Sequence, residues 1–227
     1  NKNKYKTLNP FEAIAKANGV SCYSVLTGFK WISKMIKEKE GKENYIIGGE
    51  ESFGLMIGDQ IRDKDAVSAV ALLCEMAAYE KSKGRSLFDK MIELYMQYGF
   101  YYEHLISITK KGMNGQQEIA AMMEGYRKQP PTEIAGSKVV TLLDYQLQVS
   151  TNLQTGVQTT IQLPKSNVLQ FVTEDGTKIS ARPSGTEPKI KFYFSVNTVL
   201  PNREAFDEVY AHLQNKINNI IAAMQLN

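Results

Sequence analysis

The sequence lacks the features that mark several specialised classes of protein. No apolar run approaches the roughly 20 residues that span a bilayer, and no signal peptide opens the chain, so no membrane partner is predicted. No Lys/Arg run exceeds two residues and the net charge is only +3, which argues against a nucleic-acid partner. The chain has no HExxH motif, no Cys cluster and no Asp-x-Asp-x-Asp run, so no metal site is predicted within it.

What remains is the composition of an ordinary globular protein. Hydrophobic residues make up 43% and charged residues 22% of the 227 positions, and this length allows one or two modest cores. Cys22 and Cys74 lie on apolar stretches, which predicts buried free thiols in a reducing, cytoplasmic compartment. The chain opens without Met, and we expect it to begin inside a longer protein.

The first part of the chain, residues 1–98, alternates helical and strand-like patterns. Asn9 and Pro10 are typical of a helix start, and helices are predicted over 10–18, 29–40 and 66–83, with strands over 20–25 and 45–48. This rhythm predicts a partial α/β domain, Rossmann-like, with a mixed or parallel sheet. The helix over 66–83 is apolar nearly all round, so we expect it to be buried.

The second part, residues 99–227, changes character after Gly99. A strand is predicted over 100–109, a helix over 116–127 and a closing helix with an apolar stripe after Pro201. Between these helices the pattern predicts short strands over 138–143, 146–150, 157–163, 168–172 and on either side of Arg182. This order predicts an α+β domain with a mostly antiparallel sheet and helices on one face.

The stretch around Arg182 carries the chemistry on which the functional hypothesis depends. Arg182, Ser184, Gly185 and Thr186 lie between two strand-like runs. An arginine fork, two hydroxyls and a glycine N–H suit a phosphate dianion. Period-2 alternation then places Lys191, with Lys189, on one face of the second strand. From residue types alone, a turn with solvated charges explains the stretch equally well.

Two further polar motifs lie in the first part of the chain. Glu50 and Ser52 stand between glycines at the end of a predicted strand, where a carboxylate could accept hydrogen bonds from sugar hydroxyls. For this motif by itself, a solvated acidic turn is the favoured alternative. Lys64 belongs to an Arg-Asp-Lys-Asp quartet before a helix, which either forms an ion cluster at the helix start or presents Lys64 to a ligand.

Taken together, four segments resemble the α-D-phosphohexomutase family of phosphoglucomutases and phosphomannomutases. They are Leu-Thr-Gly-Phe-Lys-Trp-Ile (26–32), Gly-Glu-Glu-Ser-Phe-Gly (49–54), Arg-Asp-Lys-Asp (62–65) and Arg-Pro-Ser-Gly-Thr-Glu-Pro (182–188), in the family's order. The resemblance covers only the family's C-terminal half. It implies most of the third domain over 1–98 and the fourth, TBP-like domain over 99–227.

The resemblance implies an enzyme of the isomerase class, an intramolecular phosphotransferase. Such enzymes interconvert hexose 1-phosphate and hexose 6-phosphate through a hexose bisphosphate, which also serves as activator, using a phosphoserine and Mg²⁺ in their first two domains. The Ser-His-Asn-Pro segment and the Asp-Gly-Asp-x-Asp loop that carry these groups do not occur in this sequence, so we expect the chain by itself to be inactive.

The resemblance also implies roles for individual residues. Glu50 and Ser52 would bind sugar hydroxyls, Thr27 and Gly28 would form a loop beside the sugar, and Lys64 would be a catalytic lysine that assists proton transfer. The phosphate that is not transferred would be held by Arg182, Ser184, Gly185, Thr186 and Lys191. Two hypotheses stay open: the substrate-binding part of a mutase that works with missing N-terminal domains, or a stand-alone sugar-phosphate-binding module without catalysis.

Overall fold

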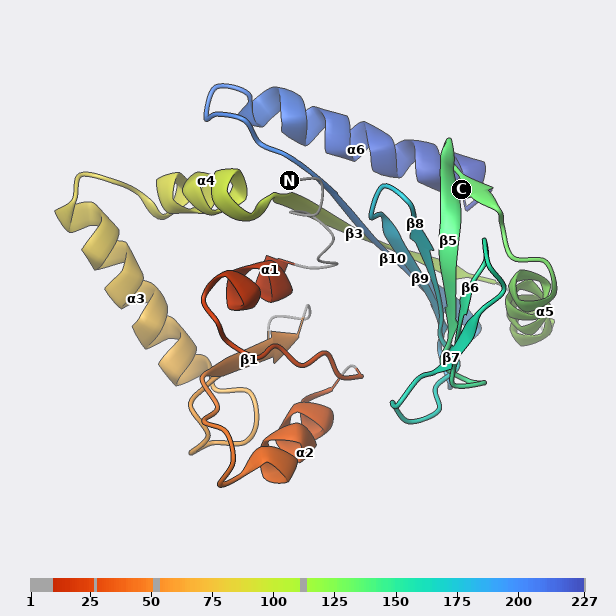
Figure 1. Ribbon diagram of the computed structural model, residues 1–227, viewed down its shortest axis with the longest axis horizontal. Helices are drawn as coiled ribbons and strands as arrows, with labels where there is room; N and C mark the ends of the chain where they lie inside the picture. Colours follow the sequence, from red (N-terminus) through yellow and green to blue (C-terminus); the bar gives the residue numbers. More distant parts are fainter. Residues whose placement is uncertain (1–9, 27, 51–53, 111–113, 227) are drawn as a thin grey trace. The chain divides into compact units, whose positions relative to one another are not determined.

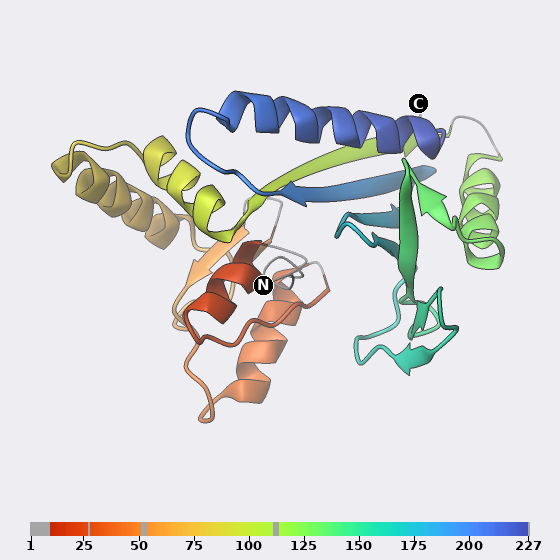
Figure 2. The same cartoon turned by 45° about the horizontal axis from the view of Figure 1, so that its top comes forward.

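The computed structural model describes residues 10–26, 28–50, 54–110 and 114–226. Contacts divide the chain into two compact units (Figures 1 and 2). The smaller unit runs from Tyr23 to Glu93, and the larger unit combines the residues up to Cys22 with those from Leu94 onward. The predicted boundary between residues 98 and 99 stays a prediction.

The smaller unit is built on a short hairpin and helices around a small core. Strands β1 (Ile47–Glu50) and β2 (Gly54–Ile57) pair antiparallel, with Glu50 opposite Gly54. Helix α2 (Phe29–Lys39) packs its apolar side on this hairpin. The core consists of Phe29, Ile36 and Met56, against which Ile32 and Tyr45 pack. Burial raises the pKa of Tyr45 to about 12, and its hydroxyl donates to the Met56 carbonyl at 3.2 Å.

The parallel, Rossmann-like arrangement predicted for the first part of the chain is not confirmed. The described strands of the smaller unit form only the antiparallel β1–β2 pair. The strand predicted over 20–25 is not observed: this segment is irregular, and Val20 and Tyr23 are 40% and 44% exposed. A strand is stable only when a neighbour completes its hydrogen-bond ladder, and no described residue offers this segment one.

Helix α3 (Ala66–Ser82) corrects another prediction. It forms where expected, but it is not buried: Val67 is 81%, Val70 60% and Leu73 54% exposed. Its main described contact is with β2, and a four-residue strand is too short to cover a 17-residue helix. Cys22 and Cys74 are likewise exposed and not buried as predicted, because their stretches are not packed on both sides.

Charged side chains join α3 to helix α4 (Leu87–Tyr98). Glu80, the one buried residue of α3 among those described, lies 3.2 Å from the Arg85 guanidinium, which also pairs with Glu93. Ser86 and Asp89 cap the start of α4, because the Ser86 hydroxyl accepts from the Asp89 N–H while the Asp89 carboxylate accepts from the Ser86 N–H at 2.7 Å.

The larger unit contains an antiparallel sheet in the order β3-β10-β9-β8-β5-β6-β7, with β4 paired to β5. The antiparallel sheet predicted for the second part of the chain is therefore observed. The strands are β3 (Phe100–Thr109), β4 (Glu133–Ile134), β5 (Ser137–Asp144), β6 (Val149–Asn152), β7 (Gln158–Thr160), β8 (Leu169–Thr173), β9 (Lys178–Pro183) and β10 (Lys189–Thr198). The helices of this unit are α1 (Pro10–Ala17), α5 (Gly115–Lys128) and α6 (Phe206–Ala223), together with the end of α4.

One face of this sheet is apolar and covered by α5 and α6. On β10, Ile190, Phe192, Phe194 and Val196 are at most 1% exposed. Helix α6 runs along β3 and β10 on this face (Figures 1 and 2). The Tyr126 ring of α5 meets Phe192 edge-on at 6.5 Å between ring centroids. Fully burying one such side chain contributes about 1.5–3 kcal/mol, so this row fixes which face of β10 points inward.

A buried ion pair ties α5 to the sheet. The Arg127 Nε lies 2.9 Å from an Asp144 carboxylate oxygen, and Asp144 is only 5% exposed. The other carboxylate oxygen accepts from the Gln146 and Leu147 backbone N–H groups, at 2.9 and 3.1 Å. Since all these groups are satisfied, the pair fixes the position of α5 without leaving a charge unpartnered.

A second ionic contact joins the β8–β9 turn to α6. The Asp175 carboxylate lies 2.8 Å from the Lys216 ammonium and also accepts from the Thr173 hydroxyl and the Thr177 N–H. Burial opposes ionisation of this carboxyl, but the hydrogen bonds from Lys216, Thr173 and Thr177 outweigh it and hold the pKa of Asp175 well below its usual value. A lowered folded-state pKa contributes stability above the unfolded value of about 3.9, and this stability is lost as the pH falls through the folded pKa.

We predict that Asp175→Asn lowers the free energy of unfolding at pH 7 by about 1 kcal/mol, a value discounted for the partial exposure of the pair. The difference from wild type should shrink as the pH falls below about 4, because the unfolded carboxyl takes up its proton there while the native carboxylate stays ionised to a lower pH. Urea unfolding followed by far-ultraviolet circular dichroism at both pH values measures this. The neighbouring variant Glu174→Gln serves as control and should change little at either pH, since Glu174 is exposed.

Candidate functional site

The candidate phosphate site is the connection between β9 and β10. The two strands pair antiparallel, and Lys191 lies directly opposite Arg182. Directly opposed residues of an antiparallel pair project from the same face, so both basic side chains share the face that α5 and α6 leave uncovered. Both side chains are exposed, whereas Ala181 and Ile190 beside them are fully buried.

Hydrogen bonds within the connection hold its backbone in place. The Ser184 N–H donates to the Lys189 carbonyl, and the Lys189 N–H donates to the Glu187 carbonyl, both at 2.7 Å. The Ser184 hydroxyl oxygen accepts from the Thr186 and Glu187 N–H groups, at 3.4 and 3.2 Å. This use of the oxygen leaves the Ser184 proton available to a ligand, while the loop is already ordered by its own contacts.

The three basic residues of the connection differ in how they are neutralised. Lys189 pairs with Glu187, at 3.1 Å from ammonium to carboxylate. Within the described residues, Arg182 and Lys191 form no ion pair. The positive charge of this loop that no described residue neutralises therefore resides on Arg182 and Lys191, and the preference for Lys191 over Lys189 as a phosphate contact stays a prediction.

The packing of the chain does not require glycine at position 185. A Cβ added at this position would meet nothing within 4 Å, and the Gly185 φ does not lie in the positive region that favours glycine. Its N–H donates no hydrogen bond to the residues that the structure describes. The fold therefore does not require glycine here, and the space beside this backbone is open to a ligand.

The predicted sugar-site residues of the smaller unit lie around Phe29. Gly28 precedes α2 with φ 115°, a conformation that favours glycine, and Phe29 follows it. The Phe29 ring and the Glu50 side chain both lie beside Gly54, where an added Cβ would collide with the ring. The Lys64 ammonium lies 4.9 Å from the centre of the Phe29 ring. The structure thus brings Gly28, Glu50 and Lys64 to one aromatic side chain.

The charged quartet that contains Lys64 has a structural role as well. Asp65 caps α3, accepting from the Val67 and Ser68 N–H groups at 3.0 and 3.3 Å. Arg62 pairs with Glu40 at 2.5 Å. Lys64 lies 2.9 Å from Asp63, and its hydrogen bonds hold the pKa of Asp63 below the usual value. The ion-cluster alternative is therefore realised, while the Lys64 side chain remains 55% exposed and accessible to a ligand.

Some predicted positions cannot be placed. Thr27 and Ser52 lie outside the described residues. The described part of the chain contains no group of three or more His, Cys, Asp or Glu side chains that could hold a metal ion. None of its helices is long and apolar enough to cross a bilayer. Sequence reasoning did not identify Phe29 as the point where the three motifs meet.

Comparison with known proteins gives consistent matches. A profile of phosphoglucomutase/phosphomannomutase alpha/beta/alpha domain III matches residues 4–98. The phosphoglucomutase of Staphylococcus aureus is 38% identical over 210 residues, 92% of this chain and 36% of that protein. The phosphoglucomutase of Staphylococcus haemolyticus is 35% identical over 204 residues, 90% of this chain and 36% of that protein. The chain thus spans about a third of the length of these relatives.

A solved structure has a similar fold. It is the open form of the exocytosis-sensitive phosphoprotein pp63/parafusin, a phosphoglucomutase from Paramecium. The match has a TM-score of 0.58 and covers 94% of this chain and 35% of that one. At 18% sequence identity it supports the fold alone.

The two glycine environments lead to a prediction about stability. Gly54→Ala should lower the free energy of unfolding by about 1–3 kcal/mol, because the new Cβ collides with the buried Phe29 ring. Gly185→Ala should leave stability nearly unchanged, since its Cβ meets open space. Denaturant titration of both variants followed by Trp31 fluorescence and circular dichroism tests this. A Gly185→Ala variant as unstable as Gly54→Ala would show that the loop glycine is structural.

Proposed function

Because the chain belongs to the phosphoglucomutase/phosphomannomutase family, we propose that it is the substrate-binding C-terminal part of a phosphohexomutase. The full-length protein would interconvert hexose 1-phosphate and hexose 6-phosphate through a bisphosphate intermediate. The observation that carries this proposal is the β9–β10 loop, where Arg182 and Lys191 form no ion pair and the Gly185 N–H donates no hydrogen bond to any residue that the structure describes. These groups all suit phosphate oxygens.

In this proposal the loop binds the phosphate that is not being transferred. The Arg182 guanidinium donates to two phosphate oxygens, the Ser184 and Thr186 hydroxyls and the Gly185 N–H donate to the others, and Lys191 adds charge. None of these contacts involves the sugar carbon, so the loop accepts the phosphate on either C1 or C6. A bisphosphate intermediate requires such a loop, because each of its two phosphates must bind there in turn.

The smaller unit would recognise the sugar. A carboxylate such as Glu50 can accept from two neighbouring hydroxyls, and Gly28 would allow the backbone to approach the ring. Lys64, which lies beside the same Phe29 ring, would assist proton transfer. Thr27 and Ser52 would complete this sugar site. Since phosphoryl transfer depends on positioning and charge neutralisation, this part of the protein would supply positioning.

The remaining chemistry would come from outside these residues. A phosphoserine and Mg²⁺ would reside in N-terminal domains, as the family implies, since this sequence carries neither the Ser-His-Asn-Pro segment nor the Asp-Gly-Asp-x-Asp loop. The exposed apolar side chains of α3 fit such a division, since a helix that is apolar all round is stable when other structure covers it. We therefore place the chain in a larger, cytoplasmic enzyme whose other domains cover α3.

The phosphate assignment predicts a specific loss of affinity. Arg182→Ala should weaken binding of inorganic phosphate, glucose 1-phosphate and glucose 6-phosphate about 10- to 150-fold, equivalent to about 1.5–3 kcal/mol. Arg182→Lys should recover only part of it, because a point charge cannot reproduce the two-pronged contact. Calorimetric titration of each ligand measures this.

The matched control is Lys189→Ala. Lys189 is already paired with Glu187, so its removal should change phosphate affinity only a few-fold. If Arg182→Ala folds and binds phosphate as tightly as wild type, the phosphate assignment is wrong. The loop is then a turn with solvated charges.

We predict that the 227-residue chain by itself does not convert glucose 1-phosphate to glucose 6-phosphate, even with Mg²⁺ and a hexose bisphosphate present. The sequence carries neither the phosphoserine segment nor the metal loop of the family. A coupled assay, with the full-length Staphylococcus aureus phosphoglucomutase as positive control, measures turnover. Phosphate binding without turnover is also the behaviour of a stand-alone sugar-phosphate-binding module, and only adding the N-terminal domains separates the two.

A further inference from the structure

The two edges of the sheet in the larger unit differ sharply. One edge is β7, which has only three residues, all exposed and polar. The other edge is β3, which pairs with β10 over ten consecutive residues without a bulge. Natural sheets usually protect a long edge with proline, lysine, a bulge or a covering segment. The stretch Leu105–Ile106–Ser107–Ile108–Thr109 has no charge and no proline.

The direction of the backbone groups on β3 follows from one hydrogen bond. The Lys110 N–H donates to the Pro188 carbonyl on the β10 side. In an antiparallel pair the residues alternate between facing the partner and facing away. Ser107 and its odd-numbered neighbours Leu105 and Thr109 therefore direct their N–H and C=O groups to the outer edge, where no hydrogen bond is recorded for them within the described chain.

We propose that this edge pairs with the same edge of a second copy of the chain. Residues 105–109 would run antiparallel to their own copies around a two-fold axis at Ser107, extending the sheet across both copies. Ser107 then pairs with its counterpart, and Leu105 pairs with Thr109 of the other copy. This register engages all the outward backbone groups of the stretch, giving two hydrogen bonds at each of three residue pairs.

The chemistry of the stretch suits a copy of itself. A two-fold axis brings identical residues together, so a charge at the centre would face its own copy and repel it. Serine at the axis avoids this conflict, and isoleucine and threonine have high strand propensity. Leu105 is 45% exposed and would pack against the methyl group of Thr109 from the other copy.

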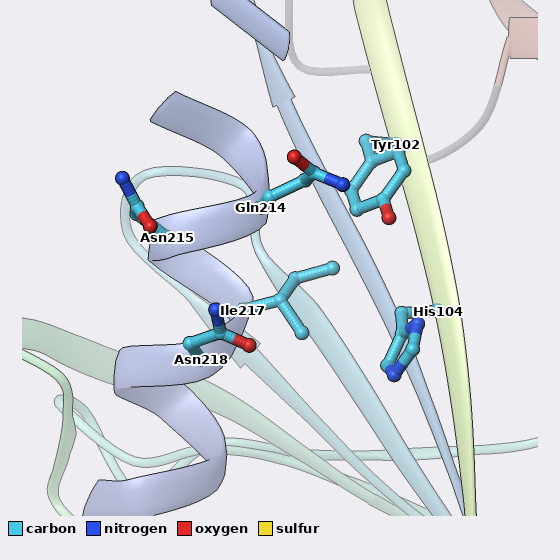
Figure 3. Close-up of a pocket in the computed structure, with 6 residues that line it drawn as sticks. All are labelled: Tyr102, His104, Gln214, Asn215, Ile217 and Asn218. Atoms are coloured by element: carbon cyan, nitrogen blue, oxygen red, sulfur yellow. The ribbon is translucent and has the colours of Figure 1, made fainter. Parts of the chain in front are cut away.

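The helix side of the same edge is also free of charge. A shallow groove between β3 and α6 is lined by Tyr102, His104, Gln214, Asn215, Ile217 and Asn218 (Figure 3). Its polar side chains are amides, a phenol and an imidazole, which both donate and accept hydrogen bonds. A second copy could approach along this side without bringing like carboxylates or ammonium groups together.

Sedimentation velocity over a wide concentration range tests the association. We expect wild type to reach twice its monomer mass of 25.5 kDa as concentration rises. Ser107→Lys should abolish the dimer by placing two ammonium groups at the axis. The matched variant Thr159→Lys, on the opposite edge strand β7, should dimerise as wild type does. A wild type that stays monomeric, or a dimer that survives Ser107→Lys, would overturn the proposal.

A disulfide test fixes the register and does not depend on the charged variant folding. In a Cys22→Ser, Cys74→Ser background, Ser107→Cys should cross-link rapidly on oxidation, because a hydrogen-bonded pair has Cα atoms about 5.5 Å apart, within disulfide reach. Leu105→Cys should not, since the two copies of residue 105 would be offset by about 13 Å along the strands. Equal cross-linking at both positions, or none at Ser107→Cys, would overturn the proposed register.

Discussion

Burial of one side of β10 is the constraint on which the larger unit depends. Ile190, Phe192, Phe194 and Val196 are almost fully buried under α5 and α6. Successive side chains of a strand point to opposite faces. Burial of this row under the helices therefore places Lys189, Lys191 and Tyr193 on the other face of the sheet. A one-residue slip would bury two lysines and expose two phenylalanines. The packing of the core therefore determines that the basic side chains of the candidate phosphate site lie on the face opposite the helices.

The loop beside this strand, the candidate phosphate site, is ordered by its own contacts before any ligand binds. Ser184 accepts two backbone N–H groups and Lys189 is neutralised by Glu187, so the loop holds its shape through its own contacts. Arg182 and Lys191 take no part in these contacts. A phosphate bound as we propose would meet donors that no described residue occupies, on a backbone already ordered, so little conformational entropy would be lost on binding.

The sequence predicted best what depends on local patterns. The strand Phe100–Thr109, the period-2 alternation of β10 and the helix over 66–83 were all expected, because each pattern lies within one element. It failed where the outcome depends on a distant partner: among the described residues, 20–25 has no strand neighbour and α3 is covered only in part, by β2. The meeting of Glu50 and Lys64 at Phe29 could not be predicted, since spacing along the chain does not define tertiary contacts.

The two units differ in how far they can stabilise themselves. The larger unit closes an apolar face of its sheet with its own helices, whereas the smaller unit has a two-stranded hairpin, a core of three buried residues and an apolar α3 left exposed. An isolated two-stranded hairpin is marginal in water, so the smaller unit depends more on structure beyond itself. The candidate phosphate loop belongs wholly to the larger unit. Its geometry should therefore persist when the smaller unit loosens, and the proposed phosphate binding should be less sensitive to such loosening than the proposed sugar recognition.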